Sequence, residues 1–296
     1  MKKIISDKQY KRLDVFLEKK LDISRSKAKK MIDQNHVLIN DFSAKPSTSV
    51  TEDDVIKYEI IEEEMNLDPV KMDLDIVFED DFLIVINKPN GLVVHPAPSV
   101  KKPTLVNGLL YHFDSLSKDN GIRPGIVHRI DAFTTGLLVV AKDDKTHDFL
   151  SKQLEKKTAK RKYVALVHGV ILNDSGTIDA PIARDLNDRK KMAVVANGKK
   201  ALTHFKVLER YDKATLIELT LETGRTHQIR VHMNYIGYPI INDPIYSRRK
   251  TIDESGQCLH AKELGFIHPK NDEYVTYEAP IPNCFLNILN LYKRGD

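Results

Sequence analysis

Short apolar segments typical of β-strands dominate the chain from residue 76 onward. Five such segments, bounded by Gly, Pro, Asn or Asp, are DFLIVINKP (81–89), GLLVVAK (136–142), KYVALVHGV (162–170), HFKVLERY (204–211) and ATLIELTLE (214–222). Three helices are expected beside them, in TLVNGLLYHF after the cap Thr104, in THDFLSKQLEKK after Asp143 and Asp144, and in TGRTHQIRVHMNYIG. Strands outnumber helices and do not alternate regularly with them. The sequence therefore favours an α+β fold with a mixed, largely antiparallel sheet over a doubly wound parallel one.

The N-terminal 62 residues predict a separate small αβ unit. Leu13, Phe16, Leu17 and Leu21 recur at helical spacing, and HVLIN and VIKYEI are typical of short strands. Ser24 is a good N-cap for a second helix, RSKAKKMI, with Ala28, Met31 and Ile32 on its inner face. The cations expected on its outer face, as candidates for RNA binding, are Arg25, Lys27, Lys29 and Lys30.

Charge is distributed unevenly along the chain. Residues 1–50 contain 12 Lys/Arg and 6 Asp/Glu, residues 51–82 contain 2 and 13, and the whole chain carries a net charge of +4. We therefore expect an acidic linker at 63–75 between the N-terminal unit (1–62) and a larger domain (76–296). Basic blocks in folded segments point first to nucleic acid, with ordinary solvated surface as the alternative.

Several classes of protein are disfavoured. No run approaches the roughly 20 apolar residues of a membrane span, and the N-terminus lacks the apolar core of a secretory signal. Cys258 and Cys284 are too few for a disulfide scaffold, which favours a cytoplasmic protein. The common nucleotide-binding and zinc motifs are absent, and the spacing of His227 and His232 does not suit two metal ligands on one helix face. We expect no cofactor, no metal and a monomer.

The segment RPGIVHRIDAFTTGLLVVAK (123–142) is the strongest candidate for chemistry. It places Asp131 on a loop before an apolar strand, beside Arg129 and the hydroxyls of Thr134 and Thr135. The alternative is an aspartate that only caps a turn. The strand residues Leu137–Val140 either wall a pocket or are plain core.

Two further segments carry candidate residues. In ETGRTHQIRVH (222–232), Arg225 lies at an apparent helix start, where it could pair with a carboxylate or a phosphate. In KRKYVALV (160–167), Tyr163 begins a strand beside three cations. The alternatives are a surface arginine and a tyrosine used for packing.

In this order and spacing, the three segments resemble the RluA/RluD family of RNA pseudouridine synthases over about residues 75–290. The stretches NKPNGLVVHPAPS (87–99), TLVNGLLYH (104–112) and ARDLNDRKKMAV (183–194) add to the resemblance. Residues 10–60 are similar to the small S4-like RNA-binding module that the RluD-like branch carries at its N-terminus. The resemblance implies isomerisation of uridine to pseudouridine without a cofactor, most often in large-subunit ribosomal RNA.

The resemblance also implies roles for individual residues. Asp131 falls on the catalytic aspartate, Tyr163 on the tyrosine that stacks on the base, and Arg225 on the active-site arginine that pairs with the aspartate. Arg129 falls on the arginine that orders the target nucleotide and its loop. The sequence departs from the common pattern after Asp131, where Ala132 and Phe133 replace a frequent Lys-Asp pair. Ile130 also stands in place of the commoner Leu.

A second basic stretch is a candidate phosphate-binding surface. Its cations are Arg184, Arg189, Lys190 and Lys191, with Lys199 and Lys200 nearby. Two rival functions remain open at this point. One is a non-catalytic RNA-binding or ribosome-assembly protein on the same fold, and the other is a hydrolase that releases free base. Asp131 could stabilise charge on the sugar, attack it, or remove a ribose proton.

Overall fold

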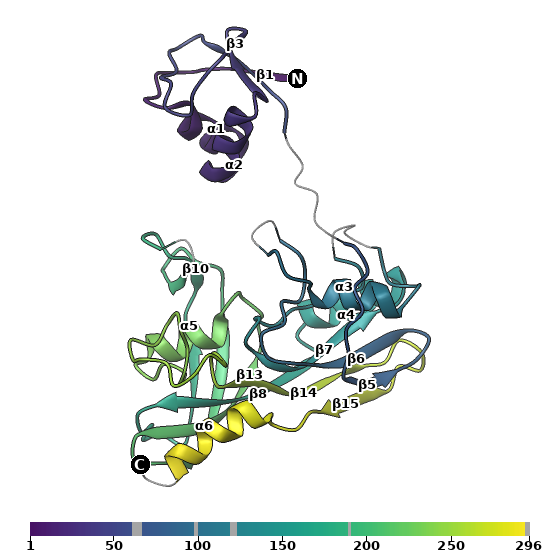
Figure 1. Cartoon of the computed structure of the whole chain (residues 1–296). Helices are drawn as coiled ribbons and strands as arrows, with labels where there is room; N and C mark the ends of the chain where they lie inside the picture. Colours follow the sequence, from purple (N-terminus) through teal and green to yellow (C-terminus); the bar gives the residue numbers. More distant parts are fainter. Residues whose placement is uncertain (61–66, 98–99, 119–122, 189–190, 294–296) are drawn as a thin grey trace. The chain divides into compact units, whose positions relative to one another are not determined.

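A computed structural model describes residues 1–60, 67–97, 100–118, 123–188 and 191–293. The chain divides into two compact units, Met1–Glu64 and Met65–Asp296 (Figure 1). Part of the expected linker, 63–66, lies outside the described residues. Residues 67–75 form no helix or strand before β5 begins at Ile76, but they are fastened to the second unit. Val70 N donates to Asn107 O at 3.0 Å, and Leu67 and Leu74 pack against the core of that unit.

The N-terminal unit is a four-stranded antiparallel sheet with two helices. The strands, in spatial order, are β1 (Lys2–Ile5), β4 (Val55–Tyr58), β2 (Val37–Ile39) and β3 (Phe42–Ser43). The predicted helices are α1 (Leu13–Leu21) and α2 (Arg25–Asp33), and Ser24 Oγ accepts from Lys27 N at 3.2 Å as its N-cap role requires. The apolar faces of both helices enclose their own core with Val37 and Ile56.

The second unit is built on one large sheet. Its spatial order is β5-β6-β7-β14-β8-β13-β12-β9, with β15 paired to β14. Among the described strand pairs only β7 and β14 run parallel, which confirms the predicted α+β fold with a largely antiparallel sheet. The strands of this sheet are β5 (Ile76–Glu79), β6 (Leu83–Lys88), β7 (Thr135–Ala141), β8 (Lys160–His168), β9 (Ser175–Asp179), β12 (Leu202–Arg210), β13 (Ala214–Leu221), β14 (Leu259–Ile267) and β15 (Tyr274–Glu278).

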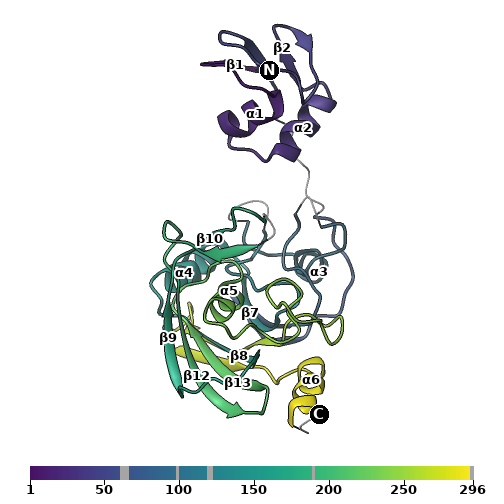
Figure 2. The same cartoon turned by 90° about the vertical axis from the view of Figure 1, so that its left-hand side faces the viewer.

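Helices cover both faces of this sheet. On β7, Leu138 and Val140 join the large core cluster, whereas Leu137 and Val139 join a second cluster with Leu150 of α4. Residues 137–140 are therefore core and do not line the pocket described below. The helices are α3 (Leu105–His112), α4 (Asp144–Glu155), α5 (Gln228–Tyr235) and α6 (Asn283–Lys293). Figure 2 shows α5 inside the curve of β8, β12 and β13, where its Ile229 and Met233 belong to the large core cluster.

The predicted helices and strands are present, with one boundary that matters. The helix expected to begin at TGRTHQIRVH begins later, at Gln228, because His227 takes a left-handed conformation (φ 57°). Residues 223–227 therefore form a turn before the helix. Several elements were not predicted, namely the strands β1, β3, β5, β9, β14 and β15, the helix α6, and a small hairpin of β10 (Ile182–Arg184) and β11 (Met192–Val194).

Candidate active site

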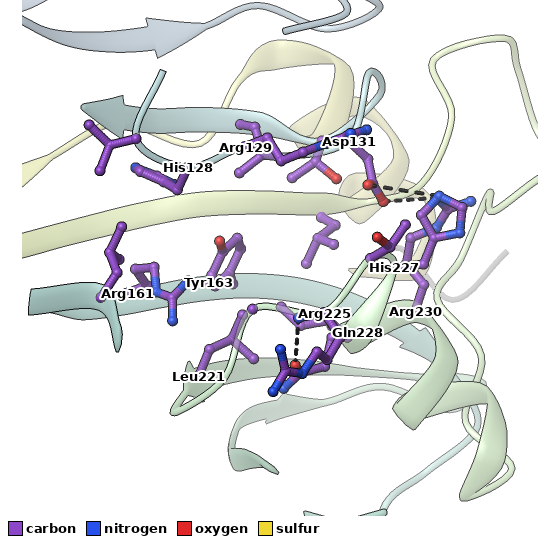
Figure 3. A pocket seen from close by; sticks show the side chains of 18 of the residues that line it. His128, Arg129, Asp131, Arg161, Tyr163, Leu221, Arg225, His227, Gln228 and Arg230 are labelled. Atoms are coloured by element: carbon purple, nitrogen blue, oxygen red, sulfur yellow. Dashed lines mark hydrogen bonds and ion pairs between the residues drawn. The ribbon is translucent and has the colours of Figure 1, made fainter. Parts of the chain in front are cut away.

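A pocket of about 360 Å³ opens in the second unit where four segments meet. Its lining comes from the loop before β7, the end of α4, the start of β8, and the turn that leads into α5 (Figure 3). All three candidates from the sequence, Asp131, Tyr163 and Arg225, line it together with Arg129. The fold therefore brings these candidates, which come from separate segments of the sequence, to one pocket.

Asp131 lies on a loop that is held from both sides. Thr134 N donates to Asp131 O at 3.1 Å, which closes the turn, and Lys88 Nζ donates to Ala132 O at 2.8 Å. Directly after the turn, Gly136 has φ +106°, and a Cβ there would lie 2.2 Å from Ala261 O. Only glycine permits this close approach of β7 to β14. The carboxylate of Asp131 is thus presented to the pocket with 19% of its side chain exposed.

Arg230, in the first turn of α5, is the arginine that pairs with Asp131. Its Nη1 lies 2.9 Å from Asp131 Oδ2, while Nε and Nη2 donate to the two carboxylate oxygens of Asp243 at 2.7 and 2.9 Å. Burial alone lowers the pKa of Arg230, but the hydrogen bonds and charges of Asp243 and Asp131 outweigh it and raise that pKa. The guanidinium is therefore a fixed positive charge beside Asp131.

The expected pairing of Arg225 with Asp131 is corrected by this geometry. Arg225 Nε donates to Lys200 O at 2.9 Å, and Arg225 N donates to Gln228 Oε1 at 3.0 Å. Arg225 lies in the turn that precedes α5, whereas Arg230 lies in the first turn of the helix. One sequence signal pointed to Arg230, since an arginine between the apolar residues Ile229 and Val231 is expected to need an acidic partner.

His227 and Tyr246 extend the network, and neither was assigned to it from the sequence. His227 Nε2 lies 3.8 Å from Asp131 Oδ1, and its Nδ1 is hydrogen-bonded to Tyr246 Oη at 2.8 Å. Burial lowers the pKa of His227 and raises the pKa of Tyr246 to about 12. The ring of Tyr246 also lies under the guanidinium of Arg230, 5.0 Å from centroid to Cζ. Near neutral pH, Asp131 thus lies beside the guanidinium of Arg230 and an uncharged imidazole.

Tyr163 supplies an aromatic surface within the pocket. It lies on β8 in register with Leu219 of β13 and Ala261 of β14, so its position is set by the centre of the sheet. Its side chain is buried, and burial raises the pKa of its hydroxyl, which stays protonated. Arg129 is exposed at the pocket and contacts His95 Nε2 at 3.2 Å. Burial, then the charges of Arg129 and Arg123, lower the pKa of His95 to about 4, so this histidine is neutral.

The predicted RNA-binding cations lie in two places. On α2, Arg25, Lys29 and Lys30 are exposed and Lys27 is half-buried. Arg25 also has a structural contact, because its Nε donates to the buried Asp14 at 3.0 Å. This bond and that of Arg12, the larger effect, lower the pKa of Asp14 to about 2.

The second set of cations surrounds the β10–β11 hairpin. Arg184 is exposed on β10, and Lys191 Nζ lies 3.8 Å from Asp188 Oδ2. Lys199 and Lys200 are exposed just after the hairpin. The predicted Arg189 and Lys190 lie outside the described residues.

Metal sites and membrane spans are both absent from the described part of the chain. Across these residues, no group of three His, Cys, Asp or Glu side chains is arranged to hold a metal ion. Within the same ranges, no helix has the length and apolar character needed to cross a bilayer.

Comparison with known proteins is consistent along the whole chain. The RNA pseudouridylate synthase family model matches residues 82–235, and the S4 domain matches residues 11–56. The chain is 50% identical to "Uncharacterized RNA pseudouridine synthase YlyB" of Bacillus subtilis, over 98% of this chain and 97% of that protein. It is 45% identical to "Ribosomal large subunit pseudouridine synthase D" of Neisseria meningitidis serogroup B, over 95% of this chain and 79% of that protein.

A solved structure supports the same assignment. Human RNA Pseudouridylate Synthase Domain Containing 1 superposes with a TM-score of 0.59 and 26% identity, covering 70% of this chain and 83% of that one. The sequence matches and the fold therefore identify the same family. The chain belongs to the RNA pseudouridine synthase family and carries an S4 domain at its N-terminus.

Proposed function

We propose that this pseudouridine synthase modifies uridines of large-subunit ribosomal RNA and that Asp131 is its catalytic carboxylate. The observation that carries the proposal is the ion pair of Asp131 with Arg230 at the pocket, 2.9 Å long and anchored by Asp243. The choice of RNA is supported by the S4 domain and by the name of the Neisseria relative.

The reaction needs a stable negative charge beside the ribose. The bond between C1′ and N1 must break, the uracil must turn, and C5 must bond to C1′ while C5 loses a proton and N1 gains one. Positive charge develops on the sugar as the first bond breaks. Stabilising that charge, attacking C1′ and removing a ribose proton all require Asp131 to be ionised. Arg230 Nη1 forms an ion pair with the carboxylate at 2.9 Å and holds it at the pocket.

Tyr163 can hold the extruded uracil, and the enclosure of the pocket excludes water. A uridine within structured RNA must be flipped out of its stack before it can reach Asp131. The ring of Tyr163 can then stack on the extruded uracil, a contact worth about 1–3 kcal/mol where it has been tested by substitution. Enclosure also keeps water from the sugar, which would otherwise be hydrolysed and leave an abasic site.

The cations of α2, of the β10–β11 hairpin and at Arg129 position the RNA rather than select its sequence. Arg25, Lys27, Lys29 and Lys30 of the S4 domain, with Arg129, Arg184 and Lys191 of the catalytic unit, would contact phosphates. Arg189 and Lys190 belong to the same proposed set by sequence. One chain supplies every pocket residue named above, so we expect a monomer, acting in the cytoplasm where ribosomal RNA is assembled into subunits.

Tritium release from RNA labelled at C5 of uridine tests the proposal directly. Ribosomal RNA from cells that lack the protein is the substrate, and release by the wild type but not by Asp131→Asn is expected. Chromatography of the products separates the rivals, because an isomerase releases no free uracil and a glycoside hydrolase does. Conversion that persists in Asp131→Asn would remove Asp131 from its proposed role, and release only from other RNAs would refute the choice of substrate.

A further inference from the structure

Arg161 is a buried cation that lines the pocket on β8 and is 8% exposed. Its Nε is buried and has no hydrogen-bond partner among the described residues. Charged groups at this degree of burial are normally paired, because an unpaired buried charge is strongly unfavourable. The missing partner is therefore expected to be a ligand that enters the pocket.

The groups around Arg161 leave its charge uncompensated. His128 is neutral, since burial and then the charge of Arg161 lower its pKa to about 3, and its Nε2 accepts from Val139 N at 3.2 Å. Tyr163 keeps its proton because burial raises its pKa. Glu155, the other acid of the pocket besides Asp131, is exposed. A cation between neutral neighbours is a site for an acceptor that carries partial or full negative charge.

The turn before α5 leaves space for this guanidinium. A Cβ on Gly224 would lie 2.8 Å from Arg161 Nη1, so any other residue there would crowd the group or displace it. Arg161 and Tyr163 are two residues apart on one strand and therefore point to the same side of the sheet. In Figure 3, Tyr163 lies between Arg161 on one side and Asp131 with Arg230 on the other.

We propose that Arg161 recognises the carbonyl edge of the flipped uracil and stabilises the negative charge of the detached base. The proposal rests on the function proposed above, because it takes Asp131 as the position of the ribose. With C1′ at Asp131 and the ring on Tyr163, the edge of uracil farthest from the sugar faces Arg161. That edge carries O4, an acceptor that matches a guanidinium donor.

The chemistry of the reaction suits a donor at this place. When the bond between C1′ and N1 breaks, its electron pair stays on the uracil and is shared with O2 and O4. A preorganised cation stabilises this charge where it develops. A half-turn of the ring about its N3–C6 axis exchanges N1 with C5 and O2 with O4, so Arg161 meets a carbonyl oxygen before and after rotation. Cytosine presents an amino group at position 4, which would leave the donors of Arg161 unpaired and so disfavours it.

Substitution of Arg161 tests the role. Arg161→Met and Arg161→Lys are compared with the wild type by single-turnover tritium release from an RNA that the wild type converts. Loss of a hydrogen bond to a charged group predicts a rate about 10- to 100-fold lower for Arg161→Met. Arg161→Lys keeps the charge and is expected to recover part of the loss. The matched control is Lys160→Met, which removes an equal charge from an exposed neighbour on the other side of the strand.

A second substrate separates recognition from a structural role. RNA with 4-thiouridine at the target replaces O4 by sulfur, a weaker acceptor. The wild type is expected to slow on this RNA, whereas Arg161→Met is not slowed further, because both changes remove the same hydrogen bond. Thermal unfolding and RNA affinity establish that each variant is folded. If Arg161→Met fails to fold, Arg161→Lys carries the same comparison.

Each outcome decides one of the two proposals. Two results with folded Arg161 variants overturn the role of Arg161. One is a conversion rate on uridine RNA within twofold of the wild type. The other is a reduction of rate on 4-thiouridine RNA, relative to uridine RNA, as large as that of the wild type. Activity that persists in Asp131→Asn, or a wild type that releases no tritium from any ribosomal RNA, overturns the proposed function instead. The role given to Arg161 would fall with it.

Discussion

Arg230 holds Asp131 from the neighbouring helix, with its Nη1 2.9 Å from Asp131 Oδ2. The same guanidinium is fixed on its other edge by Asp243, which is completely buried and also accepts from Ile245 N and Tyr246 N. Asp243 therefore positions Arg230, and Arg230 positions the carboxylate that faces the pocket. The position of the Asp131 carboxylate therefore depends on α5 as well as on its own loop.

Asp131→Asn isolates the charge from the shape of this side chain. The amide oxygen can still accept from Arg230, so the fold and the affinity for RNA should remain within about twofold of the wild type. The rate of tritium release should fall by at least about a thousandfold, the scale seen when an essential catalytic group is removed. Binding measured by filter retention and unfolding measured by circular dichroism provide the controls. Retained turnover in a folded variant would count against an aspartate catalyst.

Arg230 and Arg225 should respond differently to the same change. Arg230→Lys keeps a positive charge but cannot bridge Asp243 and Asp131 through a planar fork. We expect its single-turnover rate to fall at least about tenfold more than that of Arg225→Lys, whose native contact is to the backbone oxygen of Lys200. Arg230→Met should also lower the free energy of unfolding by about 3–5 kcal/mol, because it leaves Asp243 buried and unpaired. A larger loss of rate in Arg225→Lys than in Arg230→Lys would indicate that Arg225, and not Arg230, pairs with Asp131 during the reaction.

Local patterns were sufficient for most of the fold. The apolar spacing and the cap Ser24 predicted α2, and the pair Asp143 and Asp144 predicted the start of α4. In the structure, Ser24 Oγ accepts from Lys27 N at 3.2 Å and the side chain of Asp143 accepts from Thr146 N at 2.9 Å. The strands of the central sheet are continuous apolar runs, which strands buried on both faces require. The loop that presents Asp131 could also be predicted, since a turn had to separate the charged HRID stretch from β7.

The details of the site depend on distant parts of the chain. Asp243 and Tyr246 follow α5 in a loop with no motif of their own, so their contacts with Arg230 and His227 arise only when the chain has folded. The start of α5 depends on the positive φ of His227, a residue type that gives no such signal by itself. The pairing with Asp131 was assigned to Arg225 from its place in the ETGRTHQIRVH segment, whereas Arg230, five residues later, makes that ion pair.

Two substitutions at Tyr163 separate stacking from the hydroxyl. Tyr163→Phe keeps the ring, so the affinity for RNA should be unchanged and any loss of rate reports on the hydroxyl. Tyr163→Leu removes the aromatic surface. Its activation free energy should exceed that of Tyr163→Phe by about 1–3 kcal/mol. Single-turnover tritium release measures both. Equal rates for the Phe and Leu variants would contradict a stacking role.

The cations of α2 should contribute to RNA binding through electrostatics. Lys27→Ala combined with Lys29→Ala is expected to weaken binding and to reduce the slope of log K against log salt, by up to about 0.7–0.9 for each phosphate that is no longer neutralised. Turnover at saturating RNA should be unchanged, because neither residue belongs to the pocket. Lys206→Ala with Lys213→Ala, on and after β12, is a control of equal charge. An unaltered salt slope in the α2 variant would refute the role of these lysines.

Lys88 makes the stability of the catalytic unit depend on pH. The side chain is completely buried under the Asp131 loop, and burial, partly offset by the charge of Asp131, lowers its pKa from 10.5 to about 7. Between these two values the unfolded chain binds a proton that the folded chain does not. Stability therefore rises with pH in this window, by up to about 1.4 kcal/mol per pH unit. Below pH 7 both states are protonated, and the unfavourable burial of the charge is present in full.

Lys88→Met removes this titration from the folded and the unfolded state. The difference in the free energy of unfolding, variant minus wild type, should therefore be greatest at pH 6–7 and should fall steadily towards pH 9.5. Urea unfolding at half-unit pH intervals measures it, with Lys160→Met as the exposed control whose difference should stay flat. The loss of the bond from Lys88 Nζ to Ala132 O shifts the whole curve without changing its slope and should slow tritium release by loosening the Asp131 loop. A flat difference for Lys88→Met would mean that Lys88 keeps its proton in the folded protein throughout this range.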